Sequence, residues 1–267
     1  MPDRYAVVGN PIAHSKSPLI HTAFSRQTAQ DMVYDSLLVP VDGFVAAANQ
    51  FRLNGGLGLN VTLPFKSEAF RYAAFLSERA SAAQAVNTLK FKQGVIFGDN
   101  TDGAGLVNDL LHNLGCDIAG RKLLLLGAGG AARGVIAPLL QQLPARFVLA
   151  NRTLDKARQL AREFDGKLEA SAYADLTGGR FDIVINATSA SLANELPPLP
   201  TGVFGKYALA YDMMYGRGET PFLAFARSEG AARLADGLGM LVEQAAESFL
   251  VWRGIRPDTA PVLQLLR

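Results

Sequence analysis

The sequence predicts an α/β fold, and three observations carry that prediction. Short β-rich runs alternate with helical patterns along the chain, as in a sheet covered by helices. One run, residues 123–126, consists of four leucines, which is typical of a parallel strand buried on both faces. The chain of 267 residues is 49% apolar, so it can build one large or two modest domains with substantial cores.

The first half of the chain predicts alternating strands and helices. Its first strand is expected at residues 4–9. Ser17 and Pro18 predict the start of a helix, with the serine in the capping position and the proline in the first turn. The elements expected next are strands at 34–39 and 57–62, a helix at 45–53, a hairpin over 87–97 that turns near Gln93-Gly94, and a helix at about 102–114.

A second series of elements starts at Lys122, after a candidate linker at residues 116–121. The leucine strand leads directly into a helix over 131–142. Five further strands, which make about six in a doubly wound order, are expected at 146–150, 167–170, 181–185, 207–212 and 233–236. The last long helical pattern, residues 240–253, places its apolar side chains on one face, namely those of Leu241, Ala245, Phe249 and Trp252.

Composition argues against several classes of protein. The net charge is +2, from 26 basic and 24 acidic residues, which is too balanced to indicate a nucleic-acid surface. The longest strongly apolar run, residues 123–132, is too short to span a membrane, and no secretory signal is visible. With Cys116 as the single cysteine and no ligand spacing among the histidines, we expect no disulfide, no metal site and a cytoplasmic location.

A glycine-rich turn lies between the leucine strand and the following helix. It comprises Gly127, Ala128, Gly129, Gly130 and Ala131. In such a turn the first glycine permits the tight bend, and the second lets the backbone approach a pyrophosphate. The free N–H groups at the start of the helix then point toward the phosphates. Strand, turn and helix in register therefore predict a dinucleotide site in a Rossmann-like domain.

The end of the next strand indicates which dinucleotide is bound. An NAD site usually carries an acidic residue there, which bonds the ribose hydroxyls. This chain has Asn151, Arg152 and Thr153 instead, and an arginine can pair with a 2′-phosphate. The sequence therefore favours NADP, although Asp155 nearby leaves NAD open. The alternative is a solvated arginine at a helix start that Thr153 caps.

A set of polar side chains lies where the first-half strands end, which is where open α/β sheets bind ligands. Hydroxyls, amides, one ammonium and one carboxylate suit a small polyhydroxylated acid. Taken singly, each residue also has an ordinary interpretation as a helix cap, a turn former or a surface lysine. The set comprises Ser15, Ser17, Asn60, Thr62, Lys66, Asn87, Asn100, Thr101 and Asp102.

Seven motifs in this chain, in order from Gly9 to about Gly254, resemble those of shikimate dehydrogenases. They are residues 9–18, 60–66 with Lys66, 85–88, 98–103, 151–153, 186–189, and 237–241 with Gln244. Seven ordered motifs are far more specific than any one of them. The chain departs from the family pattern at Gln84 and at Ala190-Ser191, where glycine is frequent.

The resemblance implies two α/β domains with a cleft between them. Residues 1–101 and 239–267 would form the substrate-binding and catalytic domain. Residues 102–238 would form the Rossmann-like NADP-binding domain. The C-terminal helices would return to the first domain and bring Gln244 to the substrate.

The resemblance also implies the reaction, which is the reversible reduction of 3-dehydroshikimate to shikimate by NADPH in aromatic amino-acid biosynthesis. Lys66 would move the proton and Asp102 would hold Lys66 and the substrate hydroxyl in line. Ser15, Ser17 and Tyr215 would bind the substrate carboxylate. The ring hydroxyls would form hydrogen bonds with Asn60, Thr62, Asn87 and Gln244.

For the cofactor, the resemblance assigns two groups of residues. Residues 127–131 would hold the pyrophosphate, and Asn151, Arg152, Thr153 and Lys156 the 2′-phosphate. Thr188, Met213 and Gly237 would line the nicotinamide side. Core packing is an equally good interpretation of Met213.

The sequence is also compatible with other functions. The nearest is a quinate/shikimate dehydrogenase with relaxed substrate choice or NAD use. Another is a different small-acid oxidoreductase with the same layout, and a third is a non-catalytic shikimate-binding sensor. A sensor would be expected to lack Lys66 or Asp102, and both are present. No sequence feature marks an interface, so we expect a monomer or a weak homodimer.

Overall fold

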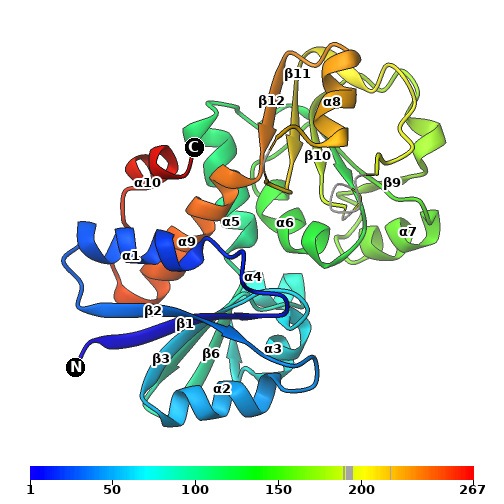
Figure 1. Cartoon of the computed structure of the whole chain (residues 1–267). Helices are drawn as coiled ribbons and strands as arrows, with labels where there is room; N and C mark the ends of the chain where they lie inside the picture. The colour runs from blue at the N-terminus through cyan, green and yellow to red at the C-terminus, as the bar shows by residue number, and fades with distance from the viewer. Residues whose placement is uncertain (189, 191–194, 217) are drawn as a thin grey trace. The chain divides into compact units, whose positions relative to one another are not determined.

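The computed structural model describes residues 1–188, 190, 195–216 and 218–267. The chain divides into two compact units, which we call unit 1 (Met1–Gly105 with Leu241–Arg267) and unit 2 (Leu106–Met240). Each unit is built on a six-stranded sheet (Figure 1). The predicted α/β class, with a doubly wound sheet in the second half, is confirmed. The domain limits drawn from the sequence stay a prediction.

The sheet of unit 1 is mixed, with the strand order β2-β1-β3-β5-β6-β4. Strand β1 pairs in parallel with β2 and β3, whereas β5 runs antiparallel to both β3 and β6. The hairpin turn lies at Gln93 and Gly94, whose φ angles of 50° and 79° are both left-handed, as a two-residue hairpin turn requires. The strands are β1 (Asp3–Gly9), β2 (Met32–Leu38), β3 (Gly56–Val61), β4 (Phe75–Leu76), β5 (Thr88–Lys92) and β6 (Val95–Asp99).

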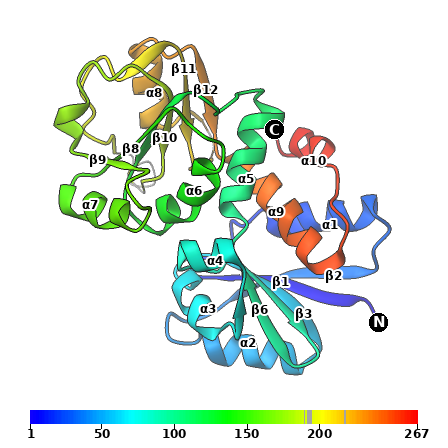
Figure 2. The same ribbon diagram turned by 180° about the vertical axis from the view of Figure 1, so that it is seen from behind.

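Helices cover both faces of this sheet. Helices α1 and α9 lie over one face and α2 and α3 over the other, as both views show (Figures 1 and 2). The α2 side is filled by a core that includes Phe44 and Phe65, and the α9 side by one that includes Tyr5 and Trp252. The helices are α1 (Ser17–Gln27), α2 (Phe44–Leu53), α3 (Lys66–Tyr72), α4 (Glu78–Ala83), α9 (Leu238–Arg253) and α10 (Ala260–Leu266).

The sheet of unit 2 is parallel, with the order β12-β11-β10-β7-β8-β9. Leu123 and Leu125 face one core cluster, and Leu124 and Leu126 face the other, so the leucine strand is buried on both sides as expected. The strands are β7 (Lys122–Leu126), β8 (Arg146–Ala150), β9 (Glu169–Ser171), β10 (Phe181–Asn186), β11 (Phe204–Asp212) and β12 (Arg233–Asp236). The helical elements are α5 (Asp102–Asn108), whose first four residues belong to unit 1, η1 (Asp109–Asn113), α6 (Gly130–Leu140), α7 (Leu154–Arg162), η2 (Tyr173–Leu176) and α8 (Pro221–Ser228).

Two local expectations from the sequence are wrong, and a third holds in its limits but not in its helix type throughout. Ser17 is the first helical residue of α1 and not its cap, because Lys16 takes the cap position and the Ser17 N–H contacts Ser15 Oγ at 3.3 Å. The helix expected over 102–114 ends its α-helical part at Asn108 and continues as one π-helical turn. Residues 116–121 are not a linker between the units, since Ile118 is fully buried in the core of unit 2.

The short helices α3, α4 and α10 were not expected, because six or seven residues give too little periodicity to recognise. In the described part of the chain, every helix is too short or too polar to cross a membrane.

One buried histidine belongs to the core of unit 1. His21 on α1 is 0% exposed and stacks on Tyr34, with ring centroids 4.2 Å apart. Its Nε2 lies 3.1 Å from Asn60 Oδ1, whereas its Nδ1 has no partner. Burial lowers the pKa of His21 to about 3, against the opposing effect of the Asn60 hydrogen bond. The ring is therefore neutral in the folded protein at ordinary pH.

We expect the free energy of unfolding to fall as the pH drops from 7 to 5. The unfolded chain binds a proton at His21 near pH 6.5, whereas the folded chain does not until about pH 3. This difference lowers the free energy of unfolding by about 2 kcal/mol between pH 7 and pH 5. Urea denaturation of the wild type and of His21→Phe at both pH values measures it. Equal pH dependence in the two proteins would show that His21 does not contribute.

Candidate active site

The centre of the candidate site in unit 1 is an ion pair. Lys66 is the first residue of α3, and Asp102 is the first residue of α5. Lys66 Nζ lies 2.6 Å from Asp102 Oδ2, and the two side chains are 27% and 14% exposed. The pair is thus ordered by a charge-assisted hydrogen bond but still open to a small molecule.

Asn87 joins this pair to two further predicted residues. Its Nδ2 donates to Asp102 Oδ1 and to Thr101 Oγ1, both at 2.8 Å, and lies 3.3 Å from Gln244 Oε1. The Thr101 N–H donates to Asn87 Oδ1 at 2.9 Å, which fixes the amide with its nitrogen toward the carboxylate. Lys66, Asn87, Asp102 and Gln244 are therefore brought together, as the sequence predicts.

The turn that carries Asp102 is held by a buried carboxylate. Asp99 Oδ1 accepts from the Asn100 N–H at 2.7 Å, and Arg79 donates to both Asp99 oxygens at 2.7 and 2.8 Å. Although burial opposes the shift, the hydrogen bonds and charge of Arg79 lower the pKa of Asp99. Asn100 Oδ1 then accepts from the Asp102 N–H at 3.1 Å. Asp102 is thus placed by its own turn, which Arg79 anchors.

Asn60, at the end of β3, has every hydrogen-bonding position of its amide filled from within unit 1. Its Oδ1 accepts from Tyr34 OH at 2.7 Å and contacts His21 Nε2. Its Nδ2 lies 3.0 Å from Ser248 Oγ and 3.2 Å from Thr88 Oγ1. The residue is 6% exposed. Asn60 therefore joins the site to the interior of the unit.

Two neighbouring loops carry the remaining predicted side chains of unit 1. The Asn10 N–H donates to the Leu63 carbonyl at 3.0 Å, and a Cβ at Gly9 would lie only 2.4 Å from Thr62 Cγ2. The loop that leads to Ser15 and Ser17 therefore begins against the loop that carries Thr62. Tyr34, which donates to Asn60 Oδ1 at 2.7 Å, is buried, and burial raises its pKa well above 10.

The glycine-rich turn of unit 2 has the geometry that a pyrophosphate needs. Gly127 has φ of 102°, and a Cβ there would meet Thr188 Cγ2 at 3.0 Å, so both conformation and space require glycine. Gly129 and Gly130 have open space around the Cβ position. Helix α6 starts at Gly130 and directs its free N–H groups toward this space. These residues fit a dinucleotide phosphate.

The residues after β8 fit a 2′-phosphate. Arg152, Thr153 and Lys156 are exposed, and Thr153 starts α7 without making a side-chain cap bond. Thr153 therefore occupies the N-cap position that the capping interpretation gives it, although its hydroxyl makes no capping bond. Asp155, because of which the sequence keeps NAD as an alternative cofactor, forms an ion pair with Arg158 at 3.3 Å.

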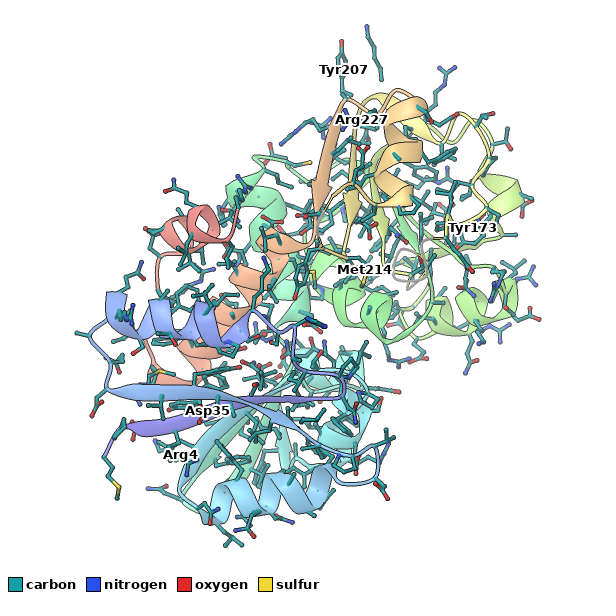
Figure 3. The ribbon with its side chains drawn as sticks, viewed as in Figure 1. Arg4, Asp35, Tyr173, Tyr207, Met214 and Arg227 are labelled. Atoms are coloured by element: carbon teal, nitrogen blue, oxygen red, sulfur yellow. The ribbon has the colours of Figure 1, made fainter. Side chains whose placement is uncertain are left out.

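The other predicted cofactor residues of unit 2 lie at the ends of β10, β11 and β12. Thr188 donates its hydroxyl to Asn186 Oδ1 at 2.7 Å. The Gly237 N–H donates to the carbonyl of Met214, which directly follows Met213 beyond β11 (Figure 3). Tyr215 comes next in this loop, is half-buried and has a pKa raised by burial. Tyr215 thus belongs to unit 2, whereas the other predicted substrate residues belong to unit 1.

Three family models match the chain. The shikimate dehydrogenase substrate-binding domain matches residues 7–89, shikimate/quinate 5-dehydrogenase matches 109–194, and the shikimate 5′-dehydrogenase C-terminal domain matches 237–267. A curated relative from Nitrosospira multiformis, named shikimate dehydrogenase (NADP(+)), is 61% identical over 100% of this chain and 98% of its own. The chain belongs to the shikimate dehydrogenase family.

Solved structures of similar proteins agree with this assignment. An Ael1 enzyme from Pseudomonas putida is 54% identical, with a TM-score of 0.96 over 99% of this chain and 98% of that one. The shikimate 5-dehydrogenase of Thermus thermophilus, solved with NADP(H) and shikimate, is 31% identical, with a TM-score of 0.88 over 98% and 97% of the two chains.

The structure explains one of the two departures from the shikimate dehydrogenase pattern. Gln84 ends α4 in the left-handed conformation, with φ of 50° and ψ of 34°. Glycine adopts this conformation without a Cβ penalty, which accounts for its frequency at this position. Asn87 nevertheless keeps its hydrogen bonds. The other departure includes Ser191, and the motif 186–189 ends at Ser189. Both serines lie outside the described part of the chain.

Sequence reasoning missed the residues that hold the site from behind, namely Tyr34, Arg79, Thr88 and Ser248. Each is a common residue type, and only Thr88 lies in one of the motifs, 85–88, which gave it no role. The described residues contain no cluster of three or more His, Cys, Asp or Glu side chains able to hold a metal ion.

We expect Gly237→Ala to weaken NADP(+) binding about tenfold, the size of a moderate overpacking penalty. A Cβ at Gly237 would lie 2.2 Å from the Met213 carbonyl oxygen, so the backbone beside the predicted nicotinamide site must move. Calorimetric titration with NADP(+) and with shikimate measures both affinities, and only the first should change. Gly216→Ala is the control, since a Cβ at Gly216 meets open space. Equal NADP(+) affinity in both variants would contradict the assignment of Gly237.

Proposed function

We propose that this chain catalyses the reversible, NADPH-dependent reduction of 3-dehydroshikimate to shikimate, a step of aromatic amino-acid biosynthesis. The observation that carries the proposal is the Lys66–Asp102 contact of 2.6 Å, which Asn87 braces. It occurs in a member of the shikimate dehydrogenase family whose relatives are named for NADP(+). A lysine, a carboxylate and an amide in contact supply the groups that a carbonyl reduction needs.

Lys66 carries the proton in this mechanism. When bound, NADPH supplies the hydride. In the reducing direction, the Lys66 ammonium stabilises negative charge on the substrate oxygen and donates its proton to it. In the oxidising direction, Lys66 takes the hydroxyl proton. Asp102 keeps Nζ in place through the 2.6 Å contact, so the proton moves without reorganisation of the site.

The polar side chains around this pair would recognise the substrate. Ser15 and Ser17 would donate hydroxyl hydrogens to the carboxylate, with Tyr215 as a further contact. Thr62, Asn87 and Gln244 would bind the ring hydroxyls, and Asn60, whose amide is bonded from within unit 1, would support them from behind. A site built to bond a hydroxyl rejects analogues that lack it, because its own polar groups are then left unpaired.

The cofactor roles that we propose for residues of unit 2 are supported by the geometry of that unit. Residues 127–131 would hold the pyrophosphate, in the space left open at Gly129 and Gly130. Asn151, Arg152, Thr153 and Lys156 would bind the 2′-phosphate, and Thr188, Met213 and Gly237 would line the nicotinamide side.

The location and the oligomeric state are part of the same proposal. One cysteine, Cys116, suits a reducing compartment such as the cytoplasm. The large exposed apolar side chains, among them Leu38, Leu143 and Tyr207, come from separate elements. We therefore propose a cytoplasmic monomer or weak homodimer, which sedimentation of the purified protein tests.

Lys66→Ala is expected to lower kcat by about 10²- to 10⁴-fold, because proton transfer loses its donor. The measurement is the absorbance of reduced nicotinamide, with shikimate or quinate and NADP(+) or NAD(+). Fast turnover is expected only with shikimate and NADP(+). Comparable rates with quinate and NAD(+) would instead indicate the broader dehydrogenase. No turnover in protein that binds shikimate would refute the proposed activity.

Arg152→Ala is expected to raise the KM for NADP(+) about 10- to 100-fold, the value of a lost charge-assisted contact to phosphate. The KM for NAD(+) should stay the same, because NAD(+) has no 2′-phosphate. Initial rates with both cofactors give the two values. Arg158→Ala is the matched control, an exposed arginine on α7 that pairs with Asp155. Equal increases for both cofactors would place Arg152 outside the phosphate site.

A further inference from the structure

A fully buried serine connects several residues of the candidate site. Ser248 lies on α9, one turn after Gln244, and is 0% exposed. Its hydroxyl oxygen is 3.0 Å from Asn60 Nδ2, 2.7 Å from Thr88 Oγ1 and 3.1 Å from Thr101 Oγ1. It also lies 3.0 Å from the Gln244 carbonyl. Because it is buried, Ser248 cannot touch a substrate, so any effect on the reaction must act through these neighbours.

The direction of the hydrogen bonds around Ser248 starts from Asn60. The Asn87 carbonyl lies 3.2 Å from the nitrogen of the Asn60 amide. A carbonyl only accepts, so the amide nitrogen must lie on this side and the oxygen on the side of Tyr34. Asn60 therefore donates to Ser248 Oγ.

The next bonds lead toward the ion pair. The single hydrogen of the Ser248 hydroxyl has two close acceptors, Thr88 Oγ1 at 2.7 Å and the Gln244 carbonyl at 3.0 Å, and the shorter contact favours Thr88. The Thr88 hydroxyl then donates to Asn87 Oδ1 at 2.8 Å. The Asn87 oxygen is thereby occupied, and its Nδ2 faces Asp102 Oδ1. Bonds that all point one way polarise one another and strengthen the whole series.

We propose that Ser248 is a positioning residue for the reaction: through Thr88 it fixes the Asn87 amide, and through Asn87 it fixes the Asp102 carboxylate that holds Lys66. This inference rests on the proposed function. Without the hydroxyl, Asn60 loses an acceptor and Thr88 loses its 2.7 Å contact, so the Thr88 oxygen is held on this side only by the longer 3.2 Å contact with Asn60 Nδ2. The Thr101 N–H still holds the Asn87 oxygen, so the effect is a loss of alignment and not of the whole site.

The experiment compares two variants and their combination. Ser248→Ala is expected to lower kcat for shikimate oxidation about tenfold, since slight misplacement of a catalytic group costs up to about 100-fold. The KM for NADP(+) should stay within about twofold. Thr88→Val, which removes the next hydroxyl at constant shape, should give a similar loss. The double variant should be no slower than the worse single variant, because both interrupt one series of bonds.

Ser25→Ala is the matched control for loss of a serine hydroxyl in unit 1. Ser25 donates to the Gln30 carbonyl at 2.8 Å, away from the candidate site, and its variant should keep the wild-type kcat. Thermal unfolding of each variant confirms that folded protein is assayed. If Ser248→Ala does not fold, Thr88→Val alone decides the question.

Two results would overturn the proposal. One is a wild-type kcat in Ser248→Ala, or in Thr88→Val where that variant decides. The other is a double variant whose loss equals the product of the single losses, which would mean independent structural effects. A wild-type enzyme that does not oxidise shikimate would refute the proposed function instead, so the two failures are distinguishable.

Discussion

Unit 1 buries a group of uncharged polar side chains, and each must find its hydrogen bonds inside the unit. Asn60, Asn87, Thr88, Thr101 and Ser248 are all at most 6% exposed. A buried donor or acceptor left without a partner costs about 1–3 kcal/mol, so five such residues would outweigh much of a typical protein's net stability. Their partners come from β3, β5, the turn before α5, and α9. Satisfying these groups therefore requires the C-terminal helix to return to the first sheet, and that return also delivers Gln244 beside Asn87.

A chain of ion pairs also helps to hold the C-terminal helix against the first sheet. Arg79 binds Asp99 through two hydrogen bonds and reaches Glu247 on α9 at 3.4 Å. Arg256 then joins Glu247 to Glu243, at 3.0 and 2.6 Å. Because the acidic groups are nearly buried, each needs its arginine, and loss of one partner would leave an uncompensated charge. The turn that carries Asp102 is thus tied to the helix that carries Gln244 and the segment beyond it.

The sequence predicted what is local and missed what depends on distant pairing. Strand β8 and strand β12 were placed at their observed limits, because each is a short β-rich run between turns. Lys66, Asp102 and Asn87 were found because they lie in compact motifs at strand ends. Ser248 was not, since its partner Asn60 lies 188 positions away and nothing local marks one serine on an amphipathic helix. The π-helical turn after Asn108 was equally invisible, because its α-helical periodicity continues unbroken.

The two units shape their candidate binding sites by different physical means. Unit 2 relies on the backbone: Gly127 has a left-handed φ, Gly237 leaves no room for a Cβ beside Met213, and α6 offers N–H groups. Side chains of many kinds can line the glycine turn without changing its backbone, provided the glycines remain, whereas the proposed 2′-phosphate contact depends on the charge of Arg152. Unit 1 relies on directed side-chain hydrogen bonds, where the orientation of one amide sets that of the next. A substitution deep in unit 1 can therefore reach the Lys66–Asp102 pair, whereas one in unit 2 acts mainly where its own atoms lie.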